Sequence, residues 1–390
     1  MIYKGNHKLG DFFTSRRERG TPGLPILSVT MNNGVVTRES LDRKMETNLS
    51  DEEHLLVRKD DIVYNMMRMW QGASGLADRD GLLSPAYVVL APKKDVDPLY
   101  ASYLFKSSRL IYLLWAYSYG LTSDRLRLYF NDFKRIPVNI PSLHEQRKIG
   151  KILSTWDKSI EITEKLIENS KAQKTVLMQQ LLSGVKRLPG FETQWKKVRL
   201  GDIAEINSGG TPKTEVEEYF GGDIPWVSIA DMTGRGKYIN KTERNITSLG
   251  LKNSAACLFP KNTILYAMYA SIGECSIATV EVSSSQAILG IRPNSLIDVE
   301  YLYLYLSSLK ERIKLQGQQG TQANLNAGMV KDFHFDLPPT DEQQKIAAVL
   351  NIADREIATL QQKLACLKQE KKALMQQLLT GKRRVKVDES

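Results

Sequence analysis

The sequence predicts an α+β protein in which two similar mixed α/β domains alternate with two long helices that form an antiparallel coiled coil. Three observations support this fold class. The phrase LMQQLLSG (177–184) returns as LMQQLLTG (374–381), 197 residues later, and HEQRKIGKIL (144–153) matches DEQQKIAAVL (341–350) at the same offset. Short apolar stretches of strand length precede both copies. An internal repeat of this kind decides the architecture before any single element does.

The repeated segments have the heptad spacing of coiled-coil helices. In the second copy the steps of 4 and 3 run through Ile346, Leu350, Ala353, Ile357, Leu360, Leu364, Leu367, Lys371, Leu374 and Leu378. The aligned and more polar seam of the first copy is Ile149, Leu153, Trp156, Ile160, Thr163, Ile167, Ser170, Lys174, Leu177 and Leu181. About forty residues at 1.5 Å rise give helices of about 60 Å. Two such helices in one chain are expected to bury their seams against each other, related by an approximate two-fold axis.

Both helices carry start and stop signals. Ser142-x-x-Glu145 and Thr340-x-x-Gln343 fit capping boxes, and a glycine follows each helix at 184 and 381. A lysine occupies the same seam position in both copies, Lys174 and Lys371. Two hypotheses remain open for this pair: the lysines reach out to solvent, or they set the register because an unpartnered buried lysine penalises other alignments.

The repeat gives the domain organisation. We expect a first domain at 1–141, the first long helix at 142–188, a second domain at 189–338, the second long helix at 339–385 and a tail at 386–390. Each domain combines strand-like stretches (DIVYNM and AYVVLA; TILYAMYA and AILGI) with a helical pattern at 99–117 or 299–315.

Composition restricts the function. A net charge of +10 and a pI near 9.2 favour an anionic partner such as nucleic acid, although residues 189–338 hold 15 basic and 16 acidic groups. Three cysteines and four histidines lack metal-ligand spacing, so we expect neither a zinc site nor a disulfide framework. The sequence shows no signal peptide and no apolar run long enough for a membrane span, so a cytoplasmic protein is the default expectation.

Two loops of the first domain combine residue types suited to reading bases. MMRMWQGASG (66–75) and GLTSDRLRLYF (120–130) supply arginines, which can grip a guanine edge, and a glutamine, which can do the same for adenine. The candidate DNA contacts here are Arg68, Trp70, Gln71, Ser123, Arg125 and Arg127. For Trp70, packing in the core is the more frequent alternative.

The second domain offers different chemistry in the same order. The stretch 208–232 combines a flexible Gly-Gly-Thr-Pro turn with a cation and the strand IPWVS, and YASIG (269–273) and QGQQGTQANLNAG (316–328) align with the two loops of the first domain. The last run is uncharged and suited to hydrogen-bonding base edges, with a plain polar surface loop as its alternative. The candidate contacts are Thr211, Lys213, Trp226, Ser228, Tyr269, Ser271, Gln318, Thr321, Gln322 and Asn324.

These ordered elements resemble the specificity subunit of type I restriction-modification systems. The resemblance rests on GGTPKT…GDIPWVS, on the EQ-x-KI helix starts and on the duplicated LMQQLL(S/T)G ends, and it runs from Leu9 to Arg384. It implies two target recognition domains that read the halves of a split, asymmetric double-stranded DNA site. The first-domain loop MMRMWQG and the second-domain loop YASIG differ strongly, which predicts two different half-sites.

The resemblance also implies partners. The paired helices would act as a ruler and dock two methyltransferase subunits, with restriction and motor subunits joining in the full complex. Methyl donor and ATP would then bind to partner subunits, with no cofactor on this chain. The expected seam or docking residues are Trp156, Thr163, Ile167, Lys174, Leu177, Leu360, Leu364, Lys371 and Leu374; Thr163 or Ser170 could instead face a methyltransferase subunit.

Two other classes of protein compete with this interpretation. A DNA methyltransferase would need an Asn/Asp-Pro-Pro-aromatic motif and a glycine-rich cofactor turn, and the nearest stretch is Asp97-Pro98-Leu99-Tyr100. Asp298 opens the matching helix of the other copy, so Asp97 as a helix N-cap with proline at N1 is the better account, and we expect no catalytic residue. A structural coiled-coil adaptor would explain the helices but would not require the duplicated domains.

Overall fold

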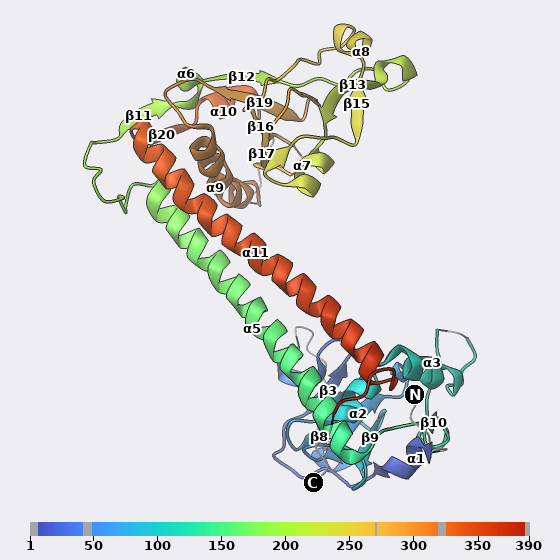
Figure 1. Ribbon diagram of the computed structural model, residues 1–390. Helices are drawn as coiled ribbons and strands as arrows, with labels where there is room; N and C mark the ends of the chain where they lie inside the picture. The colour runs from blue at the N-terminus through green and yellow to red at the C-terminus, as the bar shows by residue number, and fades with distance from the viewer. Residues whose placement is uncertain (1–6, 42–48, 123, 270, 319–324, 387–390) are drawn as a thin grey trace. The chain divides into compact units, whose positions relative to one another are not determined.

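The computed structural model describes residues 7–41, 49–122, 124–269, 271–318 and 325–386 (Figure 1). The chain divides into two compact units, residues 1–165 with 361–390, and residues 166–360. We call them the first and second units. Each unit therefore contains one globular domain and roughly half of each long helix: the first unit holds the beginning of the first long helix and the end of the second, and the second unit holds the end of the first and the beginning of the second.

The domain of the first unit is built on an antiparallel sheet of order β2-β9-β6-β7. Its strands are β2 (Phe13–Arg16), β6 (Ile62–Asn65), β7 (Ser74–Leu76) and β9 (Tyr87–Pro92). Smaller ladders pair β1 (His7–Lys8) with β10 (Pro137–Val138), β3 (Leu27–Thr30) with β4 (Gly34–Thr37), and β5 (Leu55–Val57) with β8 (Gly81–Leu83). The helices are α1 (Leu9–Phe12), α2 (Pro98–Leu104), α3 (Ser108–Ala116) and α4 (Phe130–Phe133), with 3-10 turns η1 (Arg38–Ser40), η2 (Asp51–Glu53) and η3 (Met69–Gln71).

The domain of the second unit repeats this plan with additions. Its sheet has the order β12-β19-β16-β17-β14, from β12 (Ala204–Ser208), β14 (Tyr238–Ile239), β16 (Ile264–Ala267), β17 (Cys275–Ala278) and β19 (Ile288–Pro293). A second sheet orders β15 (Arg244–Ile246), β13 (Phe220–Val227) and β18 (Ser283–Ser284), and β11 (Lys196–Arg199) pairs with β20 (His334–Leu337). The helices are α6 (Leu200–Ile203), α7 (Ile229–Arg235), α8 (Ser248–Lys252), α9 (Val299–Gln318) and α10 (Ala327–Lys331), with η4 (Glu217–Tyr219).

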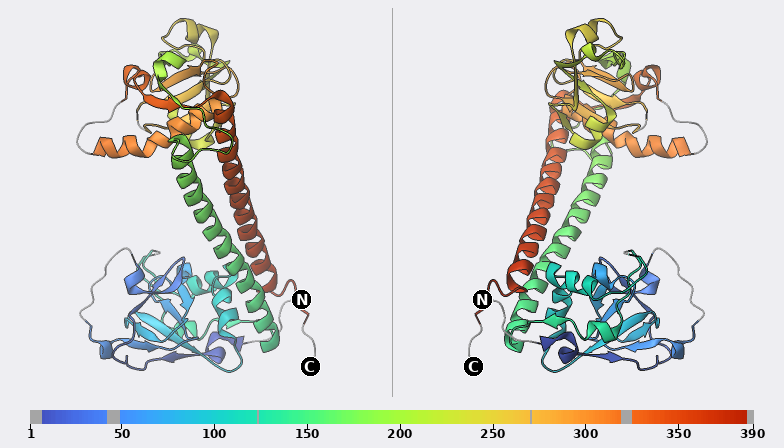
Figure 2. Two further views of the ribbon diagram at one scale, coloured as in Figure 1. Left: turned by 90° about the vertical axis from the view of Figure 1, so that its left-hand side faces the viewer. Right: turned by 90° about the vertical axis from the view of Figure 1, so that its right-hand side faces the viewer.

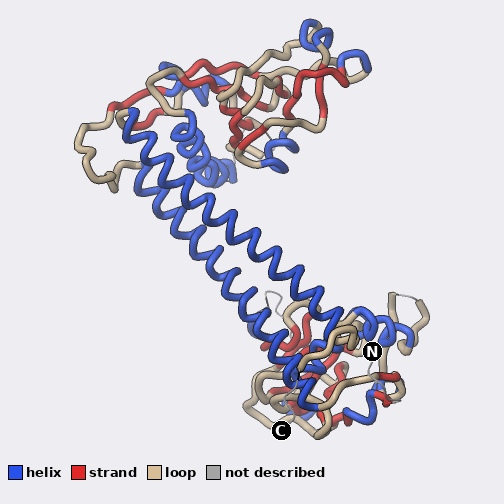
Figure 3. The backbone as a smooth tube through the Cα atoms, viewed as in Figure 1, coloured by secondary structure: helices blue, strands red, loops and turns tan. Residues whose placement is uncertain are grey.

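The shared sheet confirms the internal repeat. The order β2-β9-β6-β7 corresponds to β12-β19-β16-β17, and the registers agree. Ile62 of β6 lies opposite Leu90 of β9, and Ile264 of β16 lies opposite Ile291 of β19. Figure 3 shows mixed helix and strand in both domains. The predicted α+β class with two similar mixed domains is therefore correct.

The helix after the last sheet strand differs between the copies. In both it begins at an aspartate N-cap, since an Asp97 oxygen accepts from the backbone nitrogen of Tyr100 at 2.8 Å and an Asp298 oxygen accepts from that of Tyr301 at 3.0 Å. Pro98 sits in the first turn, which confirms the structural interpretation of the Asp-Pro-Leu-Tyr stretch. In the first unit the helical pattern expected over 99–117 is interrupted, because Ser107 caps a new helix, α3. The second copy continues as the single helix α9.

The two long helices are α5 (Leu143–Leu182, 40 residues) and α11 (Thr340–Leu378, 39 residues). They lie side by side in the views of Figure 2. Every predicted seam position, from Ile149 to Leu181 and from Ile346 to Leu378, is buried or half-buried. The heptad prediction is therefore confirmed. Among the helices that the structure describes, none is apolar over a length sufficient to cross a membrane.

The seam lysines form reciprocal ion pairs. In the second unit Lys174 Nζ on α5 lies 2.5 Å from Asp354 Oδ1 on α11, and in the first unit Lys371 on α11 pairs with Asp157 on α5. Asp354 follows Asp157 by the repeat offset of 197 residues, as Lys371 follows Lys174. Both pairs run between antiparallel helices, and both lysines are about one-fifth exposed. The lysines thus have partners across the seam, which favours the register hypothesis over simple exposure to solvent.

The repeated phrase marks where each helix enters a domain core. Leu181 and Leu182 at the end of α5 are buried in the main core of the second unit, and Leu378 and Leu379 at the end of α11 are buried in that of the first. Directly afterwards the glycines at 184 and 381 both adopt φ of 71°, the left-handed conformation that ends a helix. The phrase is duplicated because both units bury the same helix end.

The glutamates at the helix starts are buried and paired. Glu342 has no exposed side-chain surface and accepts from Arg187 Nε and Nη2, both at 2.7 Å, and from Trp195 Nε1 at 2.9 Å. The equivalent Glu145 accepts from Arg384 at 2.5 and 2.7 Å. In each unit the segment that follows one long helix therefore clamps the start of the other.

The neighbouring glutamines join the helix starts to the domains. Gln146 accepts from the backbone nitrogen of Asp97 at 2.9 Å, and Gln343 accepts from that of Asp298 at 2.8 Å. The predicted capping boxes are therefore only partly formed. Ser142 precedes α5 as expected, and its Oγ accepts from the backbone nitrogen of Glu145 at 3.5 Å, but the Glu145 carboxylate binds Arg384 instead of reaching back to Ser142. The second box is wrong, because α11 begins at Thr340 itself.

Candidate nucleic-acid interface

Two loops of the first unit meet beside the end of β6. The loop that contains η3 follows β6, and the segment 117–129 follows α3. The backbone nitrogen of Leu128 donates to the carbonyl oxygen of Met66 at 2.9 Å, which ties the loops together. Tyr119 and Arg127 form a small antiparallel bridge that closes the second loop. The structure thus brings together the two stretches that the sequence singled out in this domain.

The first of these loops exposes two of its three predicted contacts. Arg68 and Gln71 are exposed at the two ends of η3, while Met69 between them is fully buried. Trp70 is half-buried, and its Nε1 donates to the carbonyl oxygen of Met67 at 2.9 Å. The indole N–H is therefore already used. Trp70 thus supports the loop, and part of its side chain remains accessible.

The second loop presents Arg125 and Arg127, both exposed. Within the residues that the structure describes, the guanidinium groups of Arg68, Arg125 and Arg127 have no carboxylate partner. Three unpaired guanidinium groups on adjoining loops can donate to guanine edges or to phosphates. Ser123, predicted in the same loop, lies outside the described residues.

Aromatic side chains beside these loops extend the surface, and the sequence analysis missed them. Tyr112, Trp115 and Tyr119 are 62%, 47% and 59% exposed, and the rings of Tyr112 and Trp115 lie 5.8 Å apart. Large aromatic surfaces of this kind mark interaction sites, and aromatic faces beside arginines suit contacts with nucleotides. Tyr112 and Trp115 lie three residues apart on α3, whose buried residues are Leu110 and Leu114, and this amphipathic spacing was the available signal.

The corresponding loops of the second unit are joined in the same way. The backbone nitrogen of Leu325 donates to the carbonyl oxygen of Met268 at 3.4 Å, at the positions that Leu128 and Met66 occupy in the first unit. Tyr269 is 39% exposed, whereas Ser271 is half-buried and its carbonyl oxygen accepts from Glu274 in a turn. Gln318 is the last residue of α9, and its side chain is not described. Thr321, Gln322 and Asn324 lie outside the described residues.

The glycine turn of the second unit is tightly packed. A Cβ on Gly209 would lie 2.2 Å from the Ser284 hydroxyl oxygen, and one on Gly210 would lie 2.3 Å from the Ala255 backbone. The glycines allow close backbone approach, which corrects the expectation of a flexible turn. The turn carries Thr211, whose hydroxyl contacts the Gln286 side chain, and leads to the exposed Lys213.

Trp226 and Ser228 have structural roles. Trp226 is 9% exposed, and its Nε1 donates to the carbonyl oxygen of Gly210 at 3.0 Å. This hydrogen bond holds the glycine turn against the domain. Ser228 is the N-cap of α7: its Oγ accepts from the backbone nitrogen of Asp231 at 3.2 Å and lies 2.7 Å from Oδ2 of the same residue. Both side chains thus have structural roles within the domain, and the prediction that they contact DNA stays a prediction.

The predicted seam set lies between α5 and α11. Trp156, Leu177, Leu360, Leu364 and Leu374 are half-buried, and Ile167 is buried. Thr163 is only 4% exposed, and its hydroxyl donates to the carbonyl oxygen of Ser159 at 2.7 Å, so it does not face a partner subunit. The exposed apolar residues of α5 are instead Ile162, Leu166 and Val176, at 59%, 46% and 52% exposure.

Titratable clusters are few in the part of the chain that the structure describes. No group of three or more His, Cys, Asp or Glu side chains there could hold a metal ion. Burial raises the pKa of the Cys275 thiol and, less strongly, that of Cys257, so both remain protonated at neutral pH. Among the described residues, the groups that this interface offers to DNA are therefore hydrogen-bonding side chains and aromatic rings.

Comparison with known proteins places these features in a family. The model of the type I restriction modification DNA specificity domain matches twice, at residues 5–170 and 192–369. The MjaIX specificity subunit of Methanocaldococcus jannaschii is 36% identical over 163 residues, which are 41% of this chain and 38% of that protein. The MjaVIII specificity subunit of the same organism is 26% identical over 86% of this chain and 81% of its own length.

Solved structures agree on the fold. The HsdS subunit from Thermoanaerobacter tengcongensis superimposes with a TM-score of 0.56 at 17% identity, covering 96% of both chains. The S subunit of the type I restriction-modification system from M. genitalium gives 0.59 at 18% identity, over 97% of this chain and 96% of that one. The duplicated domains, the paired helices and the two family matches lead to one conclusion: the chain belongs to the type I restriction modification DNA specificity family.

Proposed function

We propose that this chain reads a bipartite, asymmetric site in duplex DNA, with one domain for each half-site. The observation that carries the proposal is the recurrence of one loop arrangement on two chemically different surfaces. In both units a main-chain hydrogen bond joins the loop after β6 or β16 to the later loop, through Leu128 and Met66 or Leu325 and Met268. The loops of the first unit expose arginines and aromatic rings, whereas among the described residues the loop after β16 exposes Tyr269, and the sequence of the later loop is uncharged and polar. Different donors and acceptors suit different base sequences.

In this proposal the domain of the first unit makes direct base contacts through Arg68, Arg125 and Arg127. Tyr112, Trp115 and Tyr119 supply flat apolar surface beside them. A purely structural adaptor would have no use for three unpaired arginines on adjoining loops, so the adaptor alternative is not favoured.

We also propose that α5 and α11 serve as spacer and docking surface. Their seam is occupied internally, so partner methyltransferase subunits would dock on outward-facing side chains such as Ile162, Leu166 and Val176 of α5. Restriction and motor subunits would join through that assembly in the cytoplasm. The chain itself acts without a catalytic centre or cofactor in this scheme, and the methyl donor and ATP bind to the partners.

The test is a change in spacer length. A heptad inserted between Lys165 and Leu166 of α5, and another between Gln362 and Lys363 of α11, keeps both seams in phase because the two points are equivalent in the repeat. The helices lengthen by about 10 Å, so the methylated site should gain roughly three unspecified base pairs at 3.4 Å each. Methylation mapping in a genome that carries the chain and its partner subunits measures this. An unchanged spacer would refute the ruler, and insertion into α5 alone serves as the control that breaks the seam.

A further inference from the structure

A groove in the first unit lies between the start of α3 and the end of α11. Its volume is about 650 Å³. The side chains that line it include six cations and no carboxylate: Lys106, Arg109, Lys368, Lys371, Lys372 and Lys382. The remaining polar lining comes from serine, threonine and glutamine side chains, the residue types that commonly hydrogen-bond phosphate oxygens. We call this the cationic groove.

Three of the six cations already have partners. Lys371 pairs with Asp157, and Lys368 lies 2.7 Å from Glu164. Lys106 Nζ donates to the carbonyl oxygen of Gly72 at 2.5 Å. Since a carbonyl oxygen carries no net charge, Lys106 leaves its positive charge uncompensated in the wall of the groove, and burial lowers its pKa.

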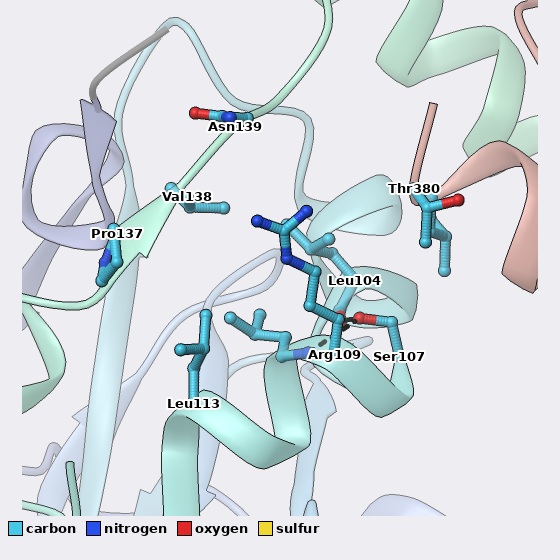
Figure 4. Close-up of a pocket in the computed structure, with 10 residues that line it drawn as sticks. Leu104, Ser107, Arg109, Leu113, Pro137, Val138, Asn139 and Thr380 are labelled. Atoms are coloured by element: carbon cyan, nitrogen blue, oxygen red, sulfur yellow. Dashed lines mark hydrogen bonds between the residues drawn. The ribbon is translucent and has the colours of Figure 1, made fainter. Parts of the chain in front are cut away.

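The other three cations are unpaired within the described residues. Arg109 and Lys372 are exposed, as is Lys382 just beyond the glycine that ends α11. Figure 4 draws the adjoining pocket, which shares Ser107, Arg109 and Thr380 with the groove. Three free charges around one groove, with no carboxylate among its lining residues, have the electrostatics suited to an anion with several charged groups.

The groove is continuous with the candidate base-reading surface. Gly72, which accepts from Lys106, ends η3 with a left-handed φ of 87° and follows Gln71 directly. The same helix, α3, supplies Arg109 to the groove and Trp115 to the exposed aromatic surface. An anion that lies in the groove would therefore adjoin the base-reading loops of this domain.

Two of the three unpaired cations of the groove, Lys372 and Lys382, are not repeated as cations in the second copy. The repeat offset places Thr175 at the position of Lys372 and Val185 at the position of Lys382. The charge of the whole chain is equally one-sided. The first unit, residues 1–165 and 361–390, holds 33 Lys and Arg against 23 Asp and Glu, whereas residues 166–360 hold 21 of each. The entire net charge of +10 thus resides in the first unit.

We propose that the cationic groove holds DNA backbone phosphates and makes the first unit the electrostatic anchor of the complex, while the second unit contributes base readout with little dependence on salt. The inference rests on the proposed DNA-reading function. An acidic segment of a partner protein would match the charge of the groove, but its continuity with the base-reading loops favours the phosphates of the same duplex. Each phosphate bound by a cation releases condensed counterions, so the groove should dominate the salt dependence of binding.

The test exchanges residues between the two copies. The double variant Lys372→Thr/Lys382→Val gives the end of α11 the residues that the other copy has at those positions, so folding should be preserved and is checked by circular dichroism. Binding of the full chain to duplex DNA, alone and with methyltransferase subunits, is measured by fluorescence anisotropy from 50 to 300 mM salt. The slope of log Kd against log salt should decrease by about 0.9 for each lost phosphate contact, or about 1.8 in total. The preference among DNA sequences should be unchanged.

Two further variants serve as controls. Lys372→Arg/Lys382→Arg keeps the charge and should keep the slope, and Lys151→Thr/Lys158→Val removes two exposed lysines of α5 outside the groove and should leave it unchanged. An unaltered slope in Lys372→Thr/Lys382→Val overturns the proposal. If that variant instead binds methyltransferase subunits more weakly, the occupant is an acidic protein segment. If the unmutated complex shows no preference for a two-part DNA sequence, the proposed function is wrong. The salt dependence of DNA binding still tests the groove in that case.

Discussion

Removal of Arg187 should destabilise the second unit by leaving a buried carboxylate without its cation. Glu342 has no exposed side-chain surface, and Arg187 supplies two of the three hydrogen bonds that it receives. Removing one partner of a buried ion pair costs about 3–5 kcal/mol, because the remaining charge is uncompensated. Arg187 is itself 28% exposed and Trp195 still donates in the variant, so water and the indole offset part of the loss. We expect Arg187→Met to lower the free energy of unfolding by about 2–3 kcal/mol.

The assay is urea unfolding of the full chain, with hydrogen exchange to assign the loss to residues of the second unit. The double variant Arg187→Met/Glu342→Gln should recover part of the stability, because the amide has no charge and still accepts from Trp195. The equivalent Arg384→Met in the first unit should cost less, because Arg384 is 54% exposed and the backbone nitrogen of Val385 also donates to Glu145. A loss below about 0.5 kcal/mol for Arg187→Met, or a double variant no better than the single one, would contradict the reasoning.

Two further predictions concern base readout and pH. Arg68→Ala should relax the preference at one half-site by about 1–3 kcal/mol per lost bidentate contact, as measured by competition between duplexes that differ at single positions; equal weakening on all sequences would make Arg68 a phosphate contact. Burial by itself would raise the pKa of Glu300. The positive charge of Lys237 and the hydrogen bonds from Lys237, Tyr238 and Asn351 outweigh this effect, so the pKa of Glu300 lies below the ordinary 4.5. A depressed carboxyl pKa stabilises the fold above the unfolded-state value and loses this effect as pH falls through the folded value, so the second unit should lose stability below about pH 4.5. Urea midpoints from pH 6 to 3 should show a weaker dependence in Glu300→Gln, and identical profiles would exclude this contribution.

The sequence was most informative where periodic burial determines structure. The seam from Ile346 to Leu378 was predicted position by position, because a long amphipathic helix has to bury its apolar stripe and the repeat supplied a second copy to check it. The caps at Asp97 and Asp298 were equally predictable, since local hydrogen bonds make them.

Tertiary partners explain what the sequence did not predict. Glu145 has the spacing of a capping box, but its carboxylate binds Arg384, which lies 239 residues further along the chain. Trp226 stands in a glycine-rich region typical of exposed loops, yet its ring is buried and its N–H supports Gly210. Tyr112 and Trp115 of α3 are exposed while Leu110 and Leu114 of the same helix are buried, and the spacing of apolar residues alone did not decide which of them would pack against the core.

The glutamine contacts at the two helix starts have a consequence for how such proteins change over generations. Within the described residues, the side-chain hydrogen bonds of Gln146 and Gln343 go to main-chain groups: the backbone nitrogens of Asp97 and Asp298, and the carbonyl oxygens of Asp95, Pro141, Leu296 and Pro338. Main-chain groups are the same whatever side chains an incoming domain carries. Recombination that replaces one domain upstream of its helix would meet the same attachment points, so a lineage can acquire a new reader without redesigning the scaffold that carries it.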